Sequence, residues 1–300
     1  MSAIARRPEA DPLYAGQPPE RASYATGMLL DAQDFVDEQT YHRGRLARSL
    51  AFVAGPGTLA GLGVSHAPAT AQRPEEIEVA PGVAVDGIGR LVEITRPACL
   101  RLARWYAAET ARDGGDTLRR AAFGLLGRFV SARTGAGALP PRGVIVDVYL
   151  RFVSCERGLT PSFAAGPFDA LDAVAASRLR DAYELHFVPR GDGLDEGFSG
   201  LPDPGPDLAA ITDPAERRAA LQDALLAAYP ARGRAGTAGA IAPPAGHPPG
   251  LDPTAVFLAR VLLPVGAGDP PARTSDAPIL DNFARRFVPA AALLARWVGA

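Results

Sequence analysis

Lysine is absent from the 300-residue chain, and all 31 of its basic residues are arginine. The absence of lysine excludes a Schiff-base lysine, the phosphate-binding lysine of a P-loop and a Ser–Lys catalytic dyad. Asparagine occurs once, as Asn282, beside a surplus of Arg, Ala and Pro that is typical of a GC-rich bacterial genome. That surplus carries no information about mechanism.

The chain also lacks a strong net charge. Its formal charge is −2 and its isoelectric point is near 6.1. Binding to nucleic acid or to an anionic membrane surface needs a basic field, which this balance does not supply. We therefore expect no nucleic-acid partner.

Long hydrophobic runs are missing as well. The first residues, MSAIARRPEADPLYAG, contain no apolar segment typical of a secretion signal, and no stretch approaches 18 uninterrupted apolar residues. We expect cytoplasmic synthesis and no membrane span. Cys99 and Cys155 form no Cys-x-x-Cys motif, so the sequence favours buried free thiols and leaves a disulfide open.

What is present is a large apolar fraction, 47%, together with 32 glycines and 29 prolines. The chain can therefore bury a core and must contain many turns and loops. We predict an α+β fold with an N-terminal helix, a small antiparallel β-meander and a mixed sheet, interrupted by helical and Pro/Gly-rich loop insertions. The expected parts are an arm over 1–26, a helix and meander over 27–97, a helical insertion over 98–141, and a strand-rich core over 142–300 with a loop insertion at 189–252 and a C-terminal helix. The core and the 27–97 module are expected to form one compact domain.

The N-terminal helix has a clear start and end. Asp31 is predicted as its N-cap, with Asp34 completing a weak capping box, and Gly55-Pro56-Gly57 ends it after about residue 53. Three short strands with glycine-containing turns follow and predict the meander. These strands are 76–79, 83–85 and 91–94.

Alternation predicts the best strand of the chain at 144–153, with Val148 on the core face and with Asp147 and Arg151 on a partly wet face. Further strands are expected at 183–188 and 256–265. Helices are predicted within 98–134 and at 169–180, 214–228 and 288–298.

Several segments, in order along the chain, resemble a group of proteins from phage-tail-like gene clusters. The matching segments are Gly27-Met28-Leu29-Leu30-Asp31-Ala32-Gln33-Asp34-Phe35 with Glu38-Gln39 and Tyr41, Gly61-Leu62-Gly63-Val64, Val79 to Arg90, Ser177 to Leu185, Phe257-Leu258-Ala259-Arg260-Val261, Asp281-Asn282 and Arg285-Arg286. The group is similar to baseplate- or tail-associated proteins of contractile injection systems. This chain departs from the pattern in the length of its 98–134 and 189–252 segments.

The resemblance implies a non-enzymatic assembly protein that docks on other tail or baseplate proteins and becomes part of an injection particle, with a homo-oligomer as a further possibility. It brings no catalytic residues and no cofactor. Interfaces favour arginine and aromatic anchors, so the candidate contact residues are chosen on that basis. They are Arg90, Trp105, Tyr106, Arg285, Arg286 and Trp297.

The remaining motifs have structural interpretations. The four histidines (His42, His66, His186 and His247) lack the close spacing of a metal site, so no metal is expected. The glycines at 55, 57 and 61 follow a helix, where a phosphate loop would follow a strand, and the acidic glycine-rich run 191–197 lacks EF-hand spacing.

Asp86 and Arg90 flank a glycine turn. We expect Asp86 to accept hydrogen bonds from the turn amides and Arg90 to leave the hairpin on its solvent-facing side, with a contact to a neighbouring subunit as the functional alternative. The alternative for the whole chain is a glycan-cleaving enzyme of the particle that uses a carboxylate pair, since sequence does not show distances across a cleft.

Overall fold

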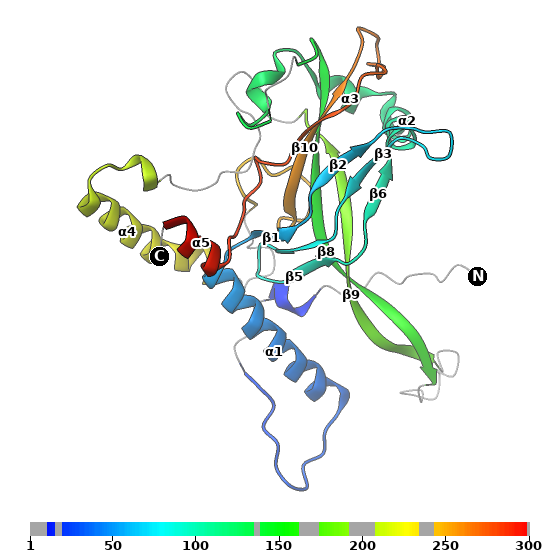
Figure 1. Cartoon of the computed structure of the whole chain (residues 1–300). Coiled ribbons are helices and arrows are strands. Elements are labelled where there is room, and N and C mark those ends of the chain that lie inside the picture. Colours follow the sequence, from blue (N-terminus) through cyan, green and yellow to red (C-terminus); the bar gives the residue numbers. More distant parts are fainter. Residues whose placement is uncertain are drawn as a thin grey trace.

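A computed structural model describes residues 11–15, 20–134, 139–161, 174–191, 208–233 and 243–298. The fold is α+β, as predicted, with helices arranged around antiparallel sheets (Figure 1). Parts of the expected arm (1–10 and 16–19), of the 169–180 helix (169–173) and of the acidic run 191–197 lie outside the described residues, as do 192–207 and 234–242 of the loop insertion.

The largest sheet has the order β11-β10-β8-β7, with β9 also paired to β8. Its strands are β7 (Ala122–Phe123), β8 (Gly143–Pro161), β9 (Val174–Pro189), β10 (Val256–Pro264) and β11 (Ile279–Asp281). The strands predicted at 144–153, 183–188 and 256–265 are confirmed. Every described pairing in this sheet is antiparallel, which differs from the mixed sheet we expected.

Residues 174–180 belong to β9, so the helix predicted at 169–180 is wrong over this part. The segment has good helix formers, but it pairs with β8 from Cys155 to Pro161 and continues a β9 ladder that begins at Val146. Tertiary pairing of this length overrides a weak local propensity.

Two smaller sheets pack against the large one. One has the order β1-β4-β5 and the other β2-β3-β6. Their strands are β1 (Gly57–Gly61), β2 (Val64–Ala67), β3 (Glu76–Val79), β4 (Gly82–Val85), β5 (Leu91–Ile94) and β6 (Ala98–Arg101).

The expected meander is therefore split. The β4–β5 hairpin is confirmed, but β3 pairs with β2 and β6 and not with β4. At the crossing between the two sheets Gly82 lies so close to β1 that an added Cβ would be 2.4 Å from the Ala60 carbonyl oxygen. Glycine permits this approach, and β4 can then pair with β1.

The first helix, α1 (Ala32–Val53), begins as predicted. The Asp31 side chain accepts hydrogen bonds from the backbone amides of Gln33 and Asp34. The Asp34 side chain in turn accepts a hydrogen bond from the Asp31 amide. This capping box fixes the start of a helix that extends away from the sheets in Figure 1.

The 98–134 segment is only partly helical. It contains β6, then α2 (Leu102–Asp113), α3 (Asp116–Arg120), β7 and the short 3-10 helix η2 (Leu126–Phe129). The break near Asp113-Gly114-Gly115 is confirmed, because both glycines have the positive φ that favours glycine.

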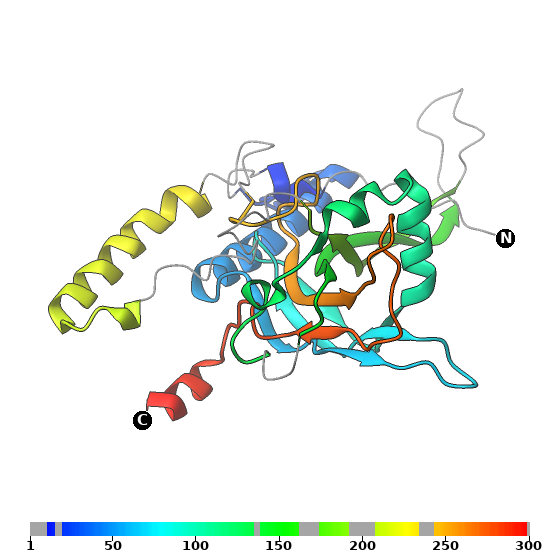
Figure 2. The same cartoon turned by 90° about the horizontal axis from the view of Figure 1, so that it is seen from above.

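The other helices are η1 (Pro12–Ala15), η3 (Leu208–Ala210), α4 (Pro214–Gly233) and α5 (Ala291–Val298). Helices α4 and α5 occupy the predicted positions and lie to one side of the sheets when seen from above (Figure 2). None of the helices in the described part of the chain is long and apolar enough to cross a membrane.

One hydrophobic cluster joins the 27–97 module to the 142–300 region. It contains side chains of β2 to β5 together with side chains of β8 and β10. Examples are Ile77, Val92, Val148, Leu150 and Leu258, each nearly or fully buried. The two regions thus share one core.

Candidate functional site

The turn between β4 and β5 is built by Asp86. Its carboxylate accepts hydrogen bonds from the backbone amides of Ile88 at 3.0 Å and Arg90 at 2.8 Å, which confirms the predicted role of Asp86. Gly89 has φ near +96° and lies against α1, where an added Cβ would be 1.8 Å from the Ala47 carbonyl oxygen. The turn is therefore held from inside by Asp86 and from outside by the helix.

Arg90 points from this turn into the protein. Its side chain is 5% exposed, so the expectation that it lies on the solvent-facing side of the hairpin is wrong. Its Nε donates to Asp86 at 2.7 Å, and Nη1 donates to Asp11 at 2.9 Å. Nη2 donates to the hydroxyls of Tyr14 and Thr254.

Aromatic rings complete the environment of Arg90. The guanidinium carbon lies 4.4 Å from the ring centre of Phe152 and 4.8 Å from that of Tyr14. Burial alone would lower the pKa of Arg90, but Asp86 and the oxygens of Tyr14 and Asp11 raise the pKa above its ordinary value. Arg90 is therefore a permanent buried cation, and its guanidinium nitrogens donate hydrogen bonds to side chains of the same chain.

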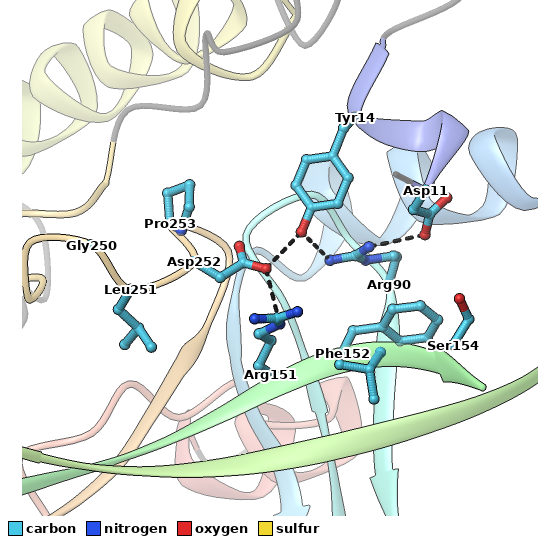
Figure 3. Close-up of a pocket in the computed structure, with 11 residues that line it drawn as sticks. Asp11, Tyr14, Arg90, Arg151, Phe152, Ser154, Gly250, Leu251, Asp252 and Pro253 are labelled. Carbon is cyan, nitrogen blue, oxygen red and sulfur yellow. Dashed lines mark hydrogen bonds and ion pairs between the residues drawn. The ribbon is translucent and has the colours of Figure 1, made fainter. Parts of the chain in front are cut away.

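A pocket of about 560 Å³ lies beside Arg90 (Figure 3). Its lining combines η1, the middle of β8 and the segment before β10. The lining residues are Asp11, Tyr14, Arg90, Arg151, Phe152, Val153, Ser154, Gly250, Leu251, Asp252 and Pro253.

Asp252 is the second anchor of this pocket. Its carboxylate accepts hydrogen bonds from the Tyr14 hydroxyl at 2.8 Å and from the amide and hydroxyl of Thr254, and it lies 3.5 Å from Nε of Arg151. Burial would raise the pKa of Asp252, but these hydrogen bonds and the charge of Arg151 lower the pKa below the ordinary value. Asp252 is therefore an ionised acceptor at neutral pH.

The pocket groups join three remote parts of the chain. Asp11 also forms an ion pair with Arg43 of α1 at 3.0 Å, so η1 is tied both to the helix and to Arg90. These contacts hold η1 against the core, and we call the group of residues that makes them the Arg90 clasp. Its members are Asp11, Tyr14, Asp86, Arg90, Asp252 and Thr254. Its chemistry is that of charge-assisted hydrogen bonding.

Two other predicted contact residues are buried. The Tyr106 hydroxyl donates to the Pro271 carbonyl at 2.7 Å, and Arg285 donates to the carbonyls of Leu62 and Asn282. Burial lowers the pKa of Arg285 to about 10, with a partial opposing effect from Asp281. These side chains tie segments of one chain together.

The other three predicted contact residues differ in exposure. Trp105 is half-buried near Phe187, Arg286 is exposed, and Trp297 is in α5 with its side chain outside the described residues. In the described part of the chain, no hydrogen bond or ring contact joins Arg90, Arg285 or Arg286 to the Trp105–Tyr106 pair. The candidates whose side chains are described do not form one site.

Apart from Asp86, the partners of Arg90 were not predicted from the sequence. Asp11 and Tyr14 lie in the segment interpreted as an arm, Asp252 ends the predicted loop insertion at 189–252, and Thr254 lies two residues beyond it. The only local signal is Asp-Pro at both 11–12 and 252–253, a turn-forming pair. The convergence of these segments depends on the fold.

A second buried ionic cluster was also missed. Asp147, expected on a partly wet face, is fully buried and accepts two hydrogen bonds from Arg260 and one from Arg190. The two arginines come from β10 and from just after β9, on either side of β8. This cluster pins the three strands together.

The cysteines and histidines hold no shared site among the described residues. Cys99 and Cys155 are free thiols, as favoured, but both are exposed, so their predicted burial is wrong. No group of three or more His, Cys, Asp or Glu side chains in these ranges is arranged to hold a metal ion.

Comparison with known proteins adds no identification. No model of a known protein family matches the chain, and no curated protein matches it significantly.

Proposed function

We propose that this protein is a structural component of a phage-tail-like contractile injection system and acts by docking on other proteins at the baseplate or tail. The observation that supports this proposal is the β8–β9 hairpin. It extends well beyond the sheet that anchors it (Figure 1), with paired residues out to Pro161 and Val174.

The outer part of this hairpin has little support within the molecule. From Cys155 to Pro161 and from Ser177 to Asp181 every side chain is exposed. A two-stranded hairpin in water is marginally stable, and both of its edges offer unpaired backbone groups. Such a ribbon gains support when another protein covers it.

Exposed apolar side chains on α1 support the same role. Large apolar residues are exposed at both ends of the helix and just before it, including Leu29, Phe35, Leu46 and Val53. A helix that is anchored on one side and apolar on the other is typical of a protein interface.

The Arg90 clasp supports an assembly role because it fixes the position of α1, which carries exposed apolar side chains. It keeps η1 on the core next to α1 and so fixes the direction in which the helix leaves the body. The segment from Val79 to Arg90, which resembles the phage-tail-like group, thus contains residues that hold the β4–β5 turn, α1 and η1 together.

The alternative is a glycan-cleaving enzyme of the particle. The pocket offers two carboxylates, Asp11 and Asp252, and this is the observation that favours it. A general acid needs a raised pKa, whereas hydrogen bonds and Arg151 lower the pKa of Asp252. We therefore favour docking.

The test is a pull-down of the tagged full chain from cells that express its neighbouring gene cluster. A matched variant removes residues 155–181, the outer hairpin, and circular dichroism checks that the shortened chain is folded. We expect sheath, tube or baseplate proteins to be recovered with the full chain and lost with the shortened one.

A full chain that recovers none of these proteins would contradict the proposal. Release of soluble sugar fragments from cell-wall or surface glycan by the purified chain would establish the alternative. An Asp252→Asn variant that abolished this release would place the reaction at the pocket.

A further inference from the structure

The outer end of the β8–β9 hairpin has one basic face. In the ladder Arg157 is opposite Arg178, and Cys155 is opposite Arg180. Because side chains alternate along a strand and opposed residues share a face, all three arginines lie on the same side. The nearby acids Glu156 and Asp181 pair with Leu179 and Ser154 and lie on the other side.

This basic face is not neutralised within the described residues. No carboxylate there lies within 4 Å of the guanidinium groups of Arg157, Arg178 or Arg180. Like charges directly opposite each other destabilise a β-ladder. The Arg157–Arg178 pair is therefore poorly placed for the isolated chain and well placed to receive a carboxylate from outside.

The opposite charge is gathered at the start of α1. Asp31, Asp34, Asp37 and Glu38 occupy the N-cap and first two turns, and the described residues place no arginine within 4 Å of them. Their partners among the described residues are the capping amides, Gln33, Tyr24 and His42. With no arginine of the described ranges paired to them, these side chains present an acidic surface that a cationic group can approach.

Apolar side chains accompany both charged patches. Leu159 is on the basic face of the hairpin and is 76% exposed, while Leu29 and Phe35 beside the acidic turns are 94% and 51% exposed. A patch of exposed apolar area bordered by charge is typical of a protein interface. The two patches are therefore opposite in charge and alike in apolar character.

We propose that the basic face of the hairpin of one molecule docks on the acidic first turns of α1 of a second copy of the chain. The inference names a partner for the docking role and rests on that proposed function. No ion pair joins the two patches within one molecule among the described residues, so each remains available to a neighbour. The chain's charge of −2 argues against nucleic acid as the occupant of so small a basic face.

The experiment is sedimentation velocity of the purified full chain over a concentration series at two salt levels. We expect association that weakens as salt rises from about 0.1 M to about 1 M, because the Debye length falls from about 10 Å to about 3 Å. Arg178→Glu should weaken association about tenfold or more, since it places a like charge against the acidic turns.

Arg178→Glu also separates docking from folding. The substitution puts opposite charges across the ladder, so the thermal midpoint of the monomer should stay equal or rise while association falls. Arg104→Glu, the same change at an exposed arginine of α2, is the matched control and should leave association at the wild-type level.

The decisive experiment exchanges the charges of the two patches. Asp37→Arg with Glu38→Arg should weaken self-association by a similar factor, and mixing this variant with Arg178→Glu should restore association between the two. Monomeric wild-type chain at about 100 µM in low salt, or unchanged association of Arg178→Glu, would overturn the inference. Recovery of other tail proteins in the pull-down would leave the proposed function standing in that case, so the two failures are distinguishable.

Discussion

Tyr14 and Asp252 are 238 positions apart in the chain, yet the hydroxyl of Tyr14 donates a 2.8 Å hydrogen bond to the carboxylate of Asp252. The same hydroxyl accepts from Arg90, which also binds Asp86 and Asp11. A short segment near the N-terminus therefore completes a buried ionic network of the core.

Arg90→Ala should be strongly destabilising. The substitution leaves Asp86 buried without its cation, and breaking a buried ion pair from one side costs about 3–5 kcal/mol. Urea unfolding followed by circular dichroism measures the change. Arg104→Ala, at an exposed site, should change the free energy of unfolding by less than about 0.5 kcal/mol, and equal effects of the two variants would contradict the importance of the clasp.

Tyr14→Phe should lower stability while keeping the ring over Arg90. Hydrogen bonds to charged groups contribute about 1.5–3 kcal/mol, and solvent access to Tyr14 places the expected loss near the low end of that range. Tyr24→Phe is the control, because the Tyr24–Glu38 hydrogen bond is exposed. Thermal unfolding of the two variants should show a larger drop for Tyr14→Phe, and a reversed order would sink the prediction.

Gly89→Ala should displace α1 from the β4–β5 turn. The positive φ disfavours alanine, and the new methyl group would overlap the carbonyl of Ala47, so we expect a loss of about 2–4 kcal/mol. Gly63→Ala is the matched control, since nothing lies within 4 Å of an added Cβ at Gly63. Similar unfolding free energies for both variants would refute the close contact.

The pH dependence of stability should contain a contribution from Glu75. Arg273, which donates two hydrogen bonds, and His66 lower the pKa of Glu75 below its ordinary 4.5, against the opposing effect of burial. A carboxylate with a lowered pKa in the folded state stabilises the protein above its unfolded pKa. That stability is lost as the pH falls below about 4.5 through the folded pKa.

Glu75→Gln removes the titrating group and should reduce stability at neutral pH more than at low pH. The difference in unfolding free energy between wild type and variant should therefore shrink on acidification from about pH 6 to about pH 3. A difference that stays constant over this range would exclude a lowered pKa at Glu75.

Local patterns predicted much of the secondary structure. The capping box at Asp31, the hairpin turn at Asp86 and the alternation around Val148 depend on neighbouring residues, so they are visible in the sequence. The helix expected at 174–180 failed because pairing with β8 outweighs helix propensity.

The Arg90 clasp was not predictable in the same way. Arg90 and Asp86 are four positions apart and were noticed together, but the burial of Arg90 comes from η1 and from Thr254. Nothing in a polar, Pro-rich segment indicates that two of its side chains enter the core.

The α+β class, the two ends of α1 and the exclusion of lysine chemistry could be read from the sequence alone, because they follow from composition and from contacts a few residues apart. Which charges are buried and which remain exposed became known from the three-dimensional arrangement of the chain. Asp147 binds Arg260 from a strand 113 positions away, whereas Arg157 lies opposite another arginine, Arg178, across its hairpin. Burial and pairing depend on segments brought together from remote positions, because the electrostatic environment of a charge is set by distances in space and not along the chain.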